Sequence, residues 1–374
     1  MHYVQNEEQT AELAASLNGT GLLAADTEAA GYHRYHDRIC LLQLSTREQT
    51  TLLDTLAVRD IAPLKPYFAD PAIEIIFHDA DYDLRLLSRD YGVEVRGLFD
   101  TKIAAQLLGE PAFGLGNLLE KFLAIKVEKK YQRADWAQRP LPPELLEYAA
   151  EDTRYLPALR DALKRALEEK GRLHWAEEEF RIEEQVHWAP SDTPSDPFLR
   201  LKGTRELRPR QLAALRELYN WREAVAAERD RASFRIMANE ALLGIAREMP
   251  ATTAELAAVR ELAPPFVERF GPELLAAVKR AQALPESALP VRPRGPGRPP
   301  PDPAFDALME RLKAARDKAA DELGLDRGFL MPRSQLEELA RGRPRSLDAL
   351  RGMPGIRRWQ AEAAGEPLLE VLRR

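Results

Sequence analysis

Five side chains between residues 26 and 152 constrain the fold of this chain more than any other feature of its sequence. Residues two apart on a strand share a face of the sheet, and residues four apart on a helix share a face of the helix. A strand ending in D-T-E and a helix containing Y-A-A-E-D would each present two polar groups on one side. The five residues are Asp26 and Glu28 in G-L-L-A-A-D-T-E, Asp83 in F-H-D-A-D-Y-D-L-R-L-L, and Tyr148 and Asp152 in Y-A-A-E-D-T-R-Y-L.

Four carboxylates brought together in this way would form a site for divalent metal ions. Hard oxygen ligands suit Mg²⁺ or Mn²⁺, whereas sulfur or imidazole ligands would favour zinc. Two such ions held about 3.5–4 Å apart can stabilise both oxygens of an in-line phosphoryl displacement. Taken singly, each motif has an ordinary explanation: a solvated strand end, a helix N-cap at Asp83, or a pair of structural helix residues. Their order along the chain favours a two-metal nuclease.

The sequence around these motifs predicts an α/β domain over residues 1–200. Short apolar runs predict strands, and from Pro142 to about Gln185 the pattern becomes helical, with proline and acids in the first turn. Strands followed by helices indicate a mixed sheet. The predicted strands are residues 22–25, 39–44, 51–54 and 74–77.

The second half of the chain predicts two copies of one small helical domain, at residues 204–281 and 304–374. Between them, residues 282–303 are rich in Pro, Gly and Arg and should form an extended linker. Residues 187–198 predict a second linker. A constant offset of 94 residues, without gaps, aligns Met237 with Met331, Leu242 with Leu336, Pro250 with Pro344, Gly271 with Gly365, and Leu274 with Leu368.

Length, cysteine content and charge limit the class of protein to which this chain can belong. A chain of 374 residues is long enough for two or three domains. Its single cysteine, Cys40, allows no intrachain disulfide. We expect a cytoplasmic protein without membrane contact, because the sequence has neither a signal-peptide pattern nor a run of roughly 18 apolar residues. The net charge of −6 concentrates in residues 1–203, and the mildly basic remainder could attract phosphates.

Together these motifs resemble the ribonuclease D family, the DEDD exonucleases with a tyrosine in their third motif. The resemblance implies a ribonuclease H-like (DnaQ-like) α/β exonuclease domain with a mixed sheet, followed by two small all-α domains similar to the helicase-and-RNase-D C-terminal (HRDC) domain. It rests on D-T-E (26–28), I-C-L-L-Q-L-S (39–45), F-H-D-A-D-Y-D-L-R-L-L (77–87), F-D-T-K-I-A-A-Q-L-L-G (99–109), and A-D-W-A-Q-R-P-L (134–141) leading into Y-A-A-E-D.

The resemblance also implies a role for each acid of the pattern. Asp26, Glu28, Asp83 and Asp152 would be ligands of two divalent ions, with Glu28 also taking part in catalysis. Tyr148 would align the attacking water on the terminal phosphodiester. The leaving 3′-oxyanion would be stabilised by the second ion.

Substrate contacts are expected both near the acids and on the helical domains. Thr27 and His78 are candidates beside the acids. After Glu28 the chain departs from many bacterial members, because Ala29 and Gly31 stand where those have Phe and Arg. The candidate phosphate contacts on the helical domains are Arg229, Arg341, Arg343 and Arg345.

The predicted activity is a 3′–5′ exoribonuclease that releases nucleoside 5′-monophosphates from RNA 3′ ends. Transfer RNA precursors or structured RNAs are the expected substrates, and a monomer is the expected state. The acids alone leave open a 3′–5′ DNA exonuclease, because both nucleic acids are phosphodiesters. A non-catalytic nucleic-acid-binding scaffold, and an adaptor whose function lies in the helical domains, are further alternatives.

Overall fold

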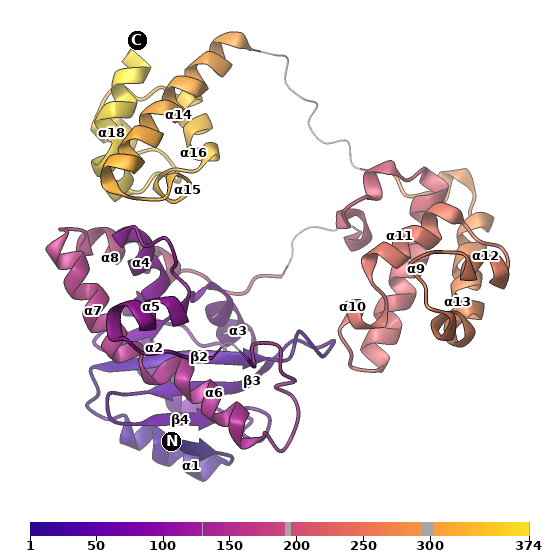
Figure 1. Cartoon of the computed structure of the whole chain (residues 1–374), viewed down its shortest axis with the longest axis horizontal. Helices are drawn as coiled ribbons and strands as arrows, with labels where there is room; N and C mark the ends of the chain where they lie inside the picture. The colour runs from indigo at the N-terminus through magenta and orange to yellow at the C-terminus, as the bar shows by residue number, and fades with distance from the viewer. Residues whose placement is uncertain (129, 191–195, 293–301, 374) are drawn as a thin grey trace. The chain divides into compact units, whose positions relative to one another are not determined.

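The computed structural model describes residues 1–128, 130–190, 196–292 and 302–373 (Figure 1). Its described residues form two compact units. Unit 1 lies within Met1–Glu28, Ile39–Trp188 and Pro300–Arg374, and unit 2 lies within Ala29–Arg38 and Ala189–Pro299. The α/β domain and the second helical repeat therefore share unit 1. The ten residues after Glu28 belong to the same unit as the first repeat.

A six-stranded mixed sheet is the centre of the described part of unit 1. The strand order is β1-β4-β3-β2-β5-β6. Three pairs, β1 with β4, β2 with β5 and β5 with β6, are parallel, and β3 runs antiparallel to β4. The predicted mixed sheet is thus confirmed. The strands are β1 (His2–Val4), β2 (Leu22–Ala29), β3 (Ile39–Ser45), β4 (Thr50–Leu53), β5 (Glu74–Phe77) and β6 (Leu98–Asp100).

Helices cover this sheet, and the core lies between them and the strands. Every residue of β3 is buried, because this strand lies inside the sheet and packs against α3 and α6. Such burial explains its nearly continuous apolar sequence. The helices of this part are α1 (Glu7–Ser16), α2 (Lys65–Ala69), α3 (Asp81–Tyr91), α4 (Thr101–Leu108), α5 (Leu115–Leu123), α6 (Pro143–Arg154), α7 (Leu156–Glu169) and α8 (Leu173–Glu183), with the 3₁₀ turn η1 (Ala62–Leu64).

Local sequence signals set the ends of the helices that follow β5 and β6. Asp100 is the N-cap of α4, where its carboxylate accepts from the backbone N–H of Lys102 and Ile103. Gly92 and Gly109 end α3 and α4 in the left-handed conformation that glycine adopts without strain. Asp83 lies inside α3, and Ala80 is the N-cap, so the N-cap alternative for Asp83 is wrong.

The two helical repeats match element by element, which confirms the predicted duplication. Corresponding helices begin 94 residues apart throughout, and the three short central helices also end 94 apart. Unit 2 contains α9 (Pro209–Glu228), α10 (Ser233–Ile236), α11 (Asn239–Glu248), α12 (Thr253–Ala257) and α13 (Pro264–Ala283). The second repeat contains α14 (Pro303–Leu323), α15 (Arg327–Leu330), α16 (Arg333–Gly342), α17 (Leu347–Arg351) and α18 (Arg358–Arg373).

A buried arginine makes the same backbone hydrogen bond at the equivalent position of each repeat. Arg222 in α9 donates from Nη1 to the carbonyl of Met237, and Arg316 in α14 donates from Nη1 to the carbonyl of Met331. Both arginines are nearly inaccessible to solvent. A buried guanidinium needs such partners because an unpaired buried charge is costly. The pair is therefore an internal feature of the duplicated fold.

The predicted linkers fall partly outside the described residues, at 191–195 and 293–301. In the described part of 282–303, α13 continues to Ala283 and a 3₁₀ turn, η4, spans Glu286–Ala288. Pro303 is the first residue of α14, a position that suits proline. Asp302 is the N-cap of this helix. Near the other linker, short 3₁₀ turns η2 (Pro197–Arg200) and η3 (Thr204–Glu206) precede α9.

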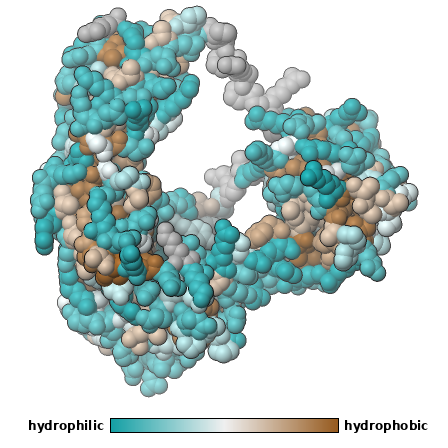
Figure 2. Space-filling model, viewed as in Figure 1, coloured by the Kyte–Doolittle hydropathy of each residue, from teal (hydrophilic) through white to brown (hydrophobic). Residues whose placement is uncertain are grey.

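Hydrophilic residues dominate the face shown in Figure 2. Among the described residues, no helix is long and apolar enough to cross a membrane. Large apolar or aromatic side chains that remain exposed are Met1, Tyr32, Tyr82, Trp188, Phe234 and Val291.

Candidate metal centre

Three of the predicted carboxylates converge where β2 meets α6. One oxygen from each of Asp26, Glu28 and Asp152 lies within 4.8 Å of the other two. The fourth acid, Asp83 of α3, is joined to β2 through Thr27, whose Oγ1 donates to Asp83 Oδ1 at 2.5 Å. The structure thus brings all four acids together from three elements that are distant in sequence.

Burial and mutual repulsion dominate the electrostatics of this cluster. Burial raises the pKa of Asp26 and of Glu28 well above the usual range, and the neighbouring carboxylates raise both further. Burial likewise raises the pKa of Asp83 and of Asp152 to about 7. Divalent cations would relieve this repulsion and favour the ionised carboxylates. A donor set made only of oxygens fits Mg²⁺ or Mn²⁺.

Tyr148 lies one helical turn before Asp152 on α6. Its ring stacks on Trp136 at a centroid distance of 6.2 Å and meets the edge of Tyr131 at 5.7 Å. Burial, followed by the charges of the nearby acids, raises the pKa of the Tyr148 hydroxyl above its ordinary value. The hydroxyl therefore stays protonated at neutral pH and can donate a hydrogen bond.

One buried hydroxyl contact joins α6 to the sheet, and a second joins the two strands on which α6 packs. Ser45 of β3 donates to Thr50 of β4 at 2.8 Å and also hydrogen-bonds Thr153 of α6 at 2.8 Å. Because one hydroxyl has one proton, Thr153 must donate to Ser45. Gln43 adds a long contact of 3.4 Å from Nε2 to Asp26 Oδ2.

Sequence reasoning did not identify these supporting residues. Their only signal is that Gln43 and Ser45 are polar residues within the apolar run of β3, where a buried side chain needs a hydrogen-bond partner. The identity of the partner Thr153 has no local signal, because it lies 108 residues away in sequence.

His78, a predicted substrate contact, follows β5 and is held by α4. Its Nδ1 lies 2.9 Å from Thr101 Oγ1, and that hydroxyl donates to the carbonyl of Phe77. Thr101 must therefore accept from His78 Nδ1–H, which leaves Nε2 as an acceptor. Burial lowers the pKa of His78 to about 4, so the ring is neutral at neutral pH. Its contact with substrate stays a prediction.

The four predicted arginines lie on the helical repeats, Arg229 in unit 2 and the other three in unit 1. Arg229 ends α9 and covers the ring of Phe270 at 5.0 Å. Arg341 donates to Glu338 at 2.7 Å, so part of its charge is already balanced. Arg343 ends α16, and Arg345 is exposed. Their phosphate contacts remain predictions.

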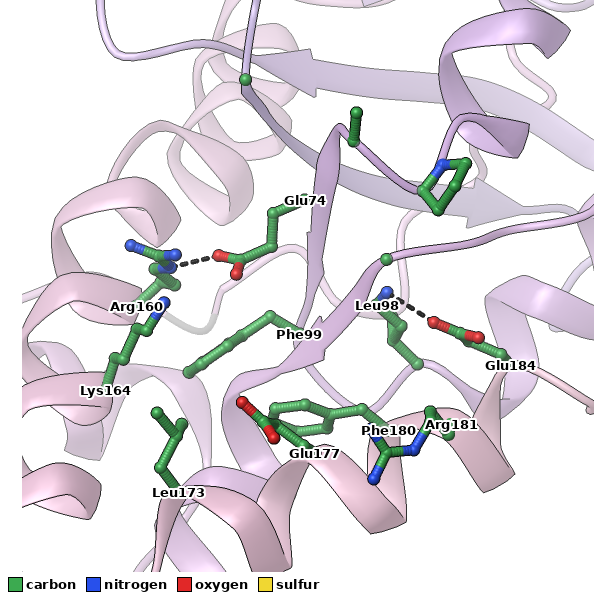
Figure 3. A pocket seen from close by; sticks show the side chains of 14 residues that line it. Glu74, Leu98, Phe99, Arg160, Lys164, Leu173, Glu177, Phe180, Arg181 and Glu184 are labelled. Atoms are coloured by element: carbon green, nitrogen blue, oxygen red, sulfur yellow. Dashed lines mark hydrogen bonds and ion pairs between the residues drawn. The ribbon is translucent and has the colours of Figure 1, made fainter.

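A separate cavity of about 390 Å³ lies where β5 and β6 begin (Figure 3). It is lined by the first residues of the parallel strands β5 and β6, whereas Asp26 and Glu28 lie in the second half of β2 and Asp83 comes after the end of β5. On its wall Glu74 pairs with Arg160, and the Leu98 N–H donates to Glu184 at 2.9 Å. This cavity is therefore not part of the metal centre.

Comparison with known families and proteins identifies relatives over the whole chain. The 3′–5′ exonuclease family matches residues 1–168, and the HRDC domain family matches residues 211–278 and 305–372. Ribonuclease D of Granulibacter bethesdensis is 30% identical over 98% of this chain and 91% of its own length. Ribonuclease D of Pseudomonas paraeruginosa is 30% identical over 100% of this chain and 97% of its own length.

Exosome complex component 10 of Mus musculus is also similar, at 33% identity over 79% of this chain. The chain spans only 35% of the length of that relative. Among solved structures, Escherichia coli RNase D, described as an exoribonuclease involved in structured RNA processing, has a TM-score of 0.68 at 28% identity, covering 100% of this chain and 98% of that one. A protein from Bifidobacterium adolescentis has a TM-score of 0.84 at 25% identity, covering 100% and 97%.

Proposed function

The chain belongs to the ribonuclease D family, and from this we propose that it is a metal-dependent 3′–5′ exoribonuclease. It hydrolyses the last phosphodiester bond at an RNA 3′ end and releases a nucleoside 5′-monophosphate. The observation that carries the proposal is the convergence of three partly buried carboxylates within 4.8 Å of one another, beside Asp83 and Tyr148.

The acids Asp26, Glu28, Asp83 and Asp152 are the proposed ligands of two divalent ions. When bound, such ions supply a water of lowered pKa and stabilise charge on the leaving oxygen. The contribution of the protein is to hold the carboxylates in place before substrate arrives. Two of them are built into a central strand, and Asp152 is carried by a helix anchored through Thr153. Such preorganisation avoids rearrangement during the reaction.

Tyr148 is the proposed positioning group for the attacking water. A protonated phenol aligns the water by hydrogen bonding and does not act as its base. Trp136 and Tyr131 contact the tyrosine ring and limit its rotation. The direction of the water is therefore set by the packing of three aromatic residues.

RNA 3′ ends, in transfer RNA precursors or other structured RNAs, are the proposed substrates. The description of the Escherichia coli relative as an exoribonuclease in structured RNA processing supports this choice. The HRDC repeats would add affinity through phosphate contacts. We further propose that the protein acts as a cytoplasmic monomer.

The test is a time course on 5′-labelled RNA with a single-stranded 3′ extension, in Mg²⁺ or Mn²⁺. The wild type should shorten the RNA stepwise from its 3′ end, and EDTA should stop it. Asp152→Asn should lower the rate by at least ~100-fold, because it removes a metal-binding charge. Glu147→Gln is the matched control on α6, since Glu147 is exposed and paired with Arg154; it should keep near-native activity.

Two results would overturn this assignment. Shortening that persists in Asp152→Asn would place the metal site elsewhere. Faster shortening of the matching DNA oligonucleotide than of RNA would make the protein a DNA exonuclease.

A further inference from the structure

Unit 2 carries two exposed aromatic rings in contact with one arginine. Tyr32 is 40% exposed and Phe234 is 50% exposed, and their ring centroids are 5.4 Å apart. The guanidinium of Arg235 lies 4.8 Å from the Tyr32 ring centre and 5.7 Å from that of Phe234. Arg235 Nε also donates to the Tyr32 carbonyl at 2.8 Å. We call these three residues the aromatic platform.

Backbone contacts within unit 2 fix the two segments that form the platform. The Ala232 N–H donates to the carbonyl of His33 at 3.1 Å, immediately before α10. The His36 N–H contacts the Asp230 carboxylate at 3.3 Å. A groove of about 600 Å³ runs beside Phe234 and is also lined by Tyr35 and Tyr219. The two segments are therefore held together, and the groove leaves space for a ligand beside the Phe234 ring.

The second repeat shows that the helical fold does not require this exposed phenylalanine. At the constant offset of 94, Gly328 corresponds to Phe234 and Phe329 to Arg235. The short helix α15 nevertheless has the same length as α10. Phe329 packs on Trp359 inside its own repeat, at 5.9 Å. Between the two repeats as the structure describes them, the exposed phenylalanine is thus found in the first alone, and folding of the repeat does not explain it.

We propose that Tyr32, Phe234 and Arg235 bind nucleobases of a single-stranded RNA 3′ tail, just upstream of the nucleotide being removed. Aromatic rings and guanidinium planes stack on any base, which suits an enzyme that must accept each base in turn. The inference rests on the proposed function, because it takes RNA as the ligand.

A short length of chain joins Tyr32 of the platform to the catalytic strand. Tyr32 follows Glu28 by four residues, so their Cα atoms can be no more than ~14 Å apart. The platform would hold the tail while the terminal nucleotide leaves.

The test measures binding in full-length Asp152→Asn protein, so that it does not depend on cleavage. Fluorescence anisotropy gives the Kd of a labelled single-stranded oligoadenylate and of a matched oligomer with abasic sugars near its 3′ end. Phe234→Gly should weaken oligoadenylate binding about tenfold. It should change binding of the abasic oligomer less than twofold, because that ligand has no bases to stack there. Phe234→Trp should bind as tightly as the parent.

Trp188→Ala is the control, since Trp188 is exposed but lies outside the platform. It should leave both Kd values unchanged. An equal Kd for Phe234→Gly and its parent would overturn the inference, as would an equal loss on both oligomers, which would indicate an effect on phosphate binding. Because the assay needs no cleavage, a failure of the exonuclease proposal would appear separately, as absence of activity in the wild type.

Discussion

At the scale of single residues, the candidate metal centre concentrates groups that are unfavourable without a cation. Asp83 and Asp152 have pKa values of about 7 because burial disfavours their charge. The pKa of an aspartate in the unfolded chain is near 3.8, and the pKa of these two in the folded protein is about 7. The folded state therefore binds these protons more tightly than the unfolded state does. Raising the pH between these values therefore destabilises the folded state.

We expect the melting temperature of the metal-free protein to fall as the pH rises from 5 to 7.5. Each kcal/mol lost from the free energy of unfolding should lower the melting temperature by about 2–4 °C in a domain of this size. Mn²⁺ should raise the melting temperature most at pH 7.5, where the ligands bind it ionised. Calorimetry of Asp152→Asn should show a smaller pH dependence, because one titrating group is gone. A pH-independent melting temperature of metal-free wild type would contradict the electrostatic account.

Short-range patterns indicated four of the five residues of the centre, whereas Asp83 was predicted from the order of the motifs and from the family that they resemble. The spacing of Asp26 and Glu28 on a strand, and of Tyr148 and Asp152 on a helix, depends only on backbone geometry. The contacts of Ser45 and Gln43 depend on which elements pack together, and no local pattern encodes that. The roles of the five residues as ligands and positioning group remain predictions.

At the scale of elements, α6 is the part of the fold on which the site depends most. It carries both Tyr148 and Asp152, and it packs on β3 and β4. Its start at Pro143 was predictable from the proline and acid signals of the first turn. The strands β1 and β6 were not predicted, because three residues are too few to show a period.

Removing the Thr153 hydroxyl should loosen this helix while leaving every candidate ligand in place. Thr153→Val should lower the unfolding free energy by about 1 kcal/mol, through loss of one buried hydrogen bond. It should also lower kcat more than it raises KM, since the acids would be less well aligned. Urea unfolding and steady-state kinetics measure the two effects, and Thr153→Ser should restore both. Unchanged kcat in Thr153→Val would show that the hydrogen bond does not align the centre.

At the scale of the whole molecule, the second repeat is attached to the α/β domain within unit 1. Arg172 donates to the carbonyls of Leu107 and Leu323, both at 2.7 Å, in the last turns of α4 and α14. A cation is favourable at helix C-termini. Glu178 of α8 accepts from the first backbone N–H groups of α18, and Trp175 stacks on Trp359.

Removing the Glu178 carboxylate should therefore release the start of α18. Glu178→Ala should lower the free energy of unfolding by about 1 kcal/mol, as loss of a helix cap does. It should also speed hydrogen exchange of the α18 amides. Glu177→Ala is the matched control, because its side chain is exposed on the same helix. Equal exchange rates in the two variants would mean that Glu178 does not cap α18.

The family and the succession of folds were predictable from sequence, and the matches to exonuclease and HRDC families confirm both. The attachment of α18 to α8 was not, because its partners are about 180 residues apart. Arg357, a basic residue of the second repeat, pairs with Glu179 of α8 at 3.2 Å. Charge in a helical sequence does not tell whether its partner is a nucleic acid or another helix.

The constant offset between the repeats has a consequence for the gene. An in-frame deletion of 94 codons between equivalent points would join the front of one repeat to the back of the other, helix for helix. The junction could lie before or after α10 and its counterpart α15. In either case the hybrid domain would contain one arginine at the position shared by Arg222 and Arg316, and one methionine whose carbonyl accepts its hydrogen bond. Unequal recombination could therefore shorten this protein to a single repeat in one step and still encode a complete domain.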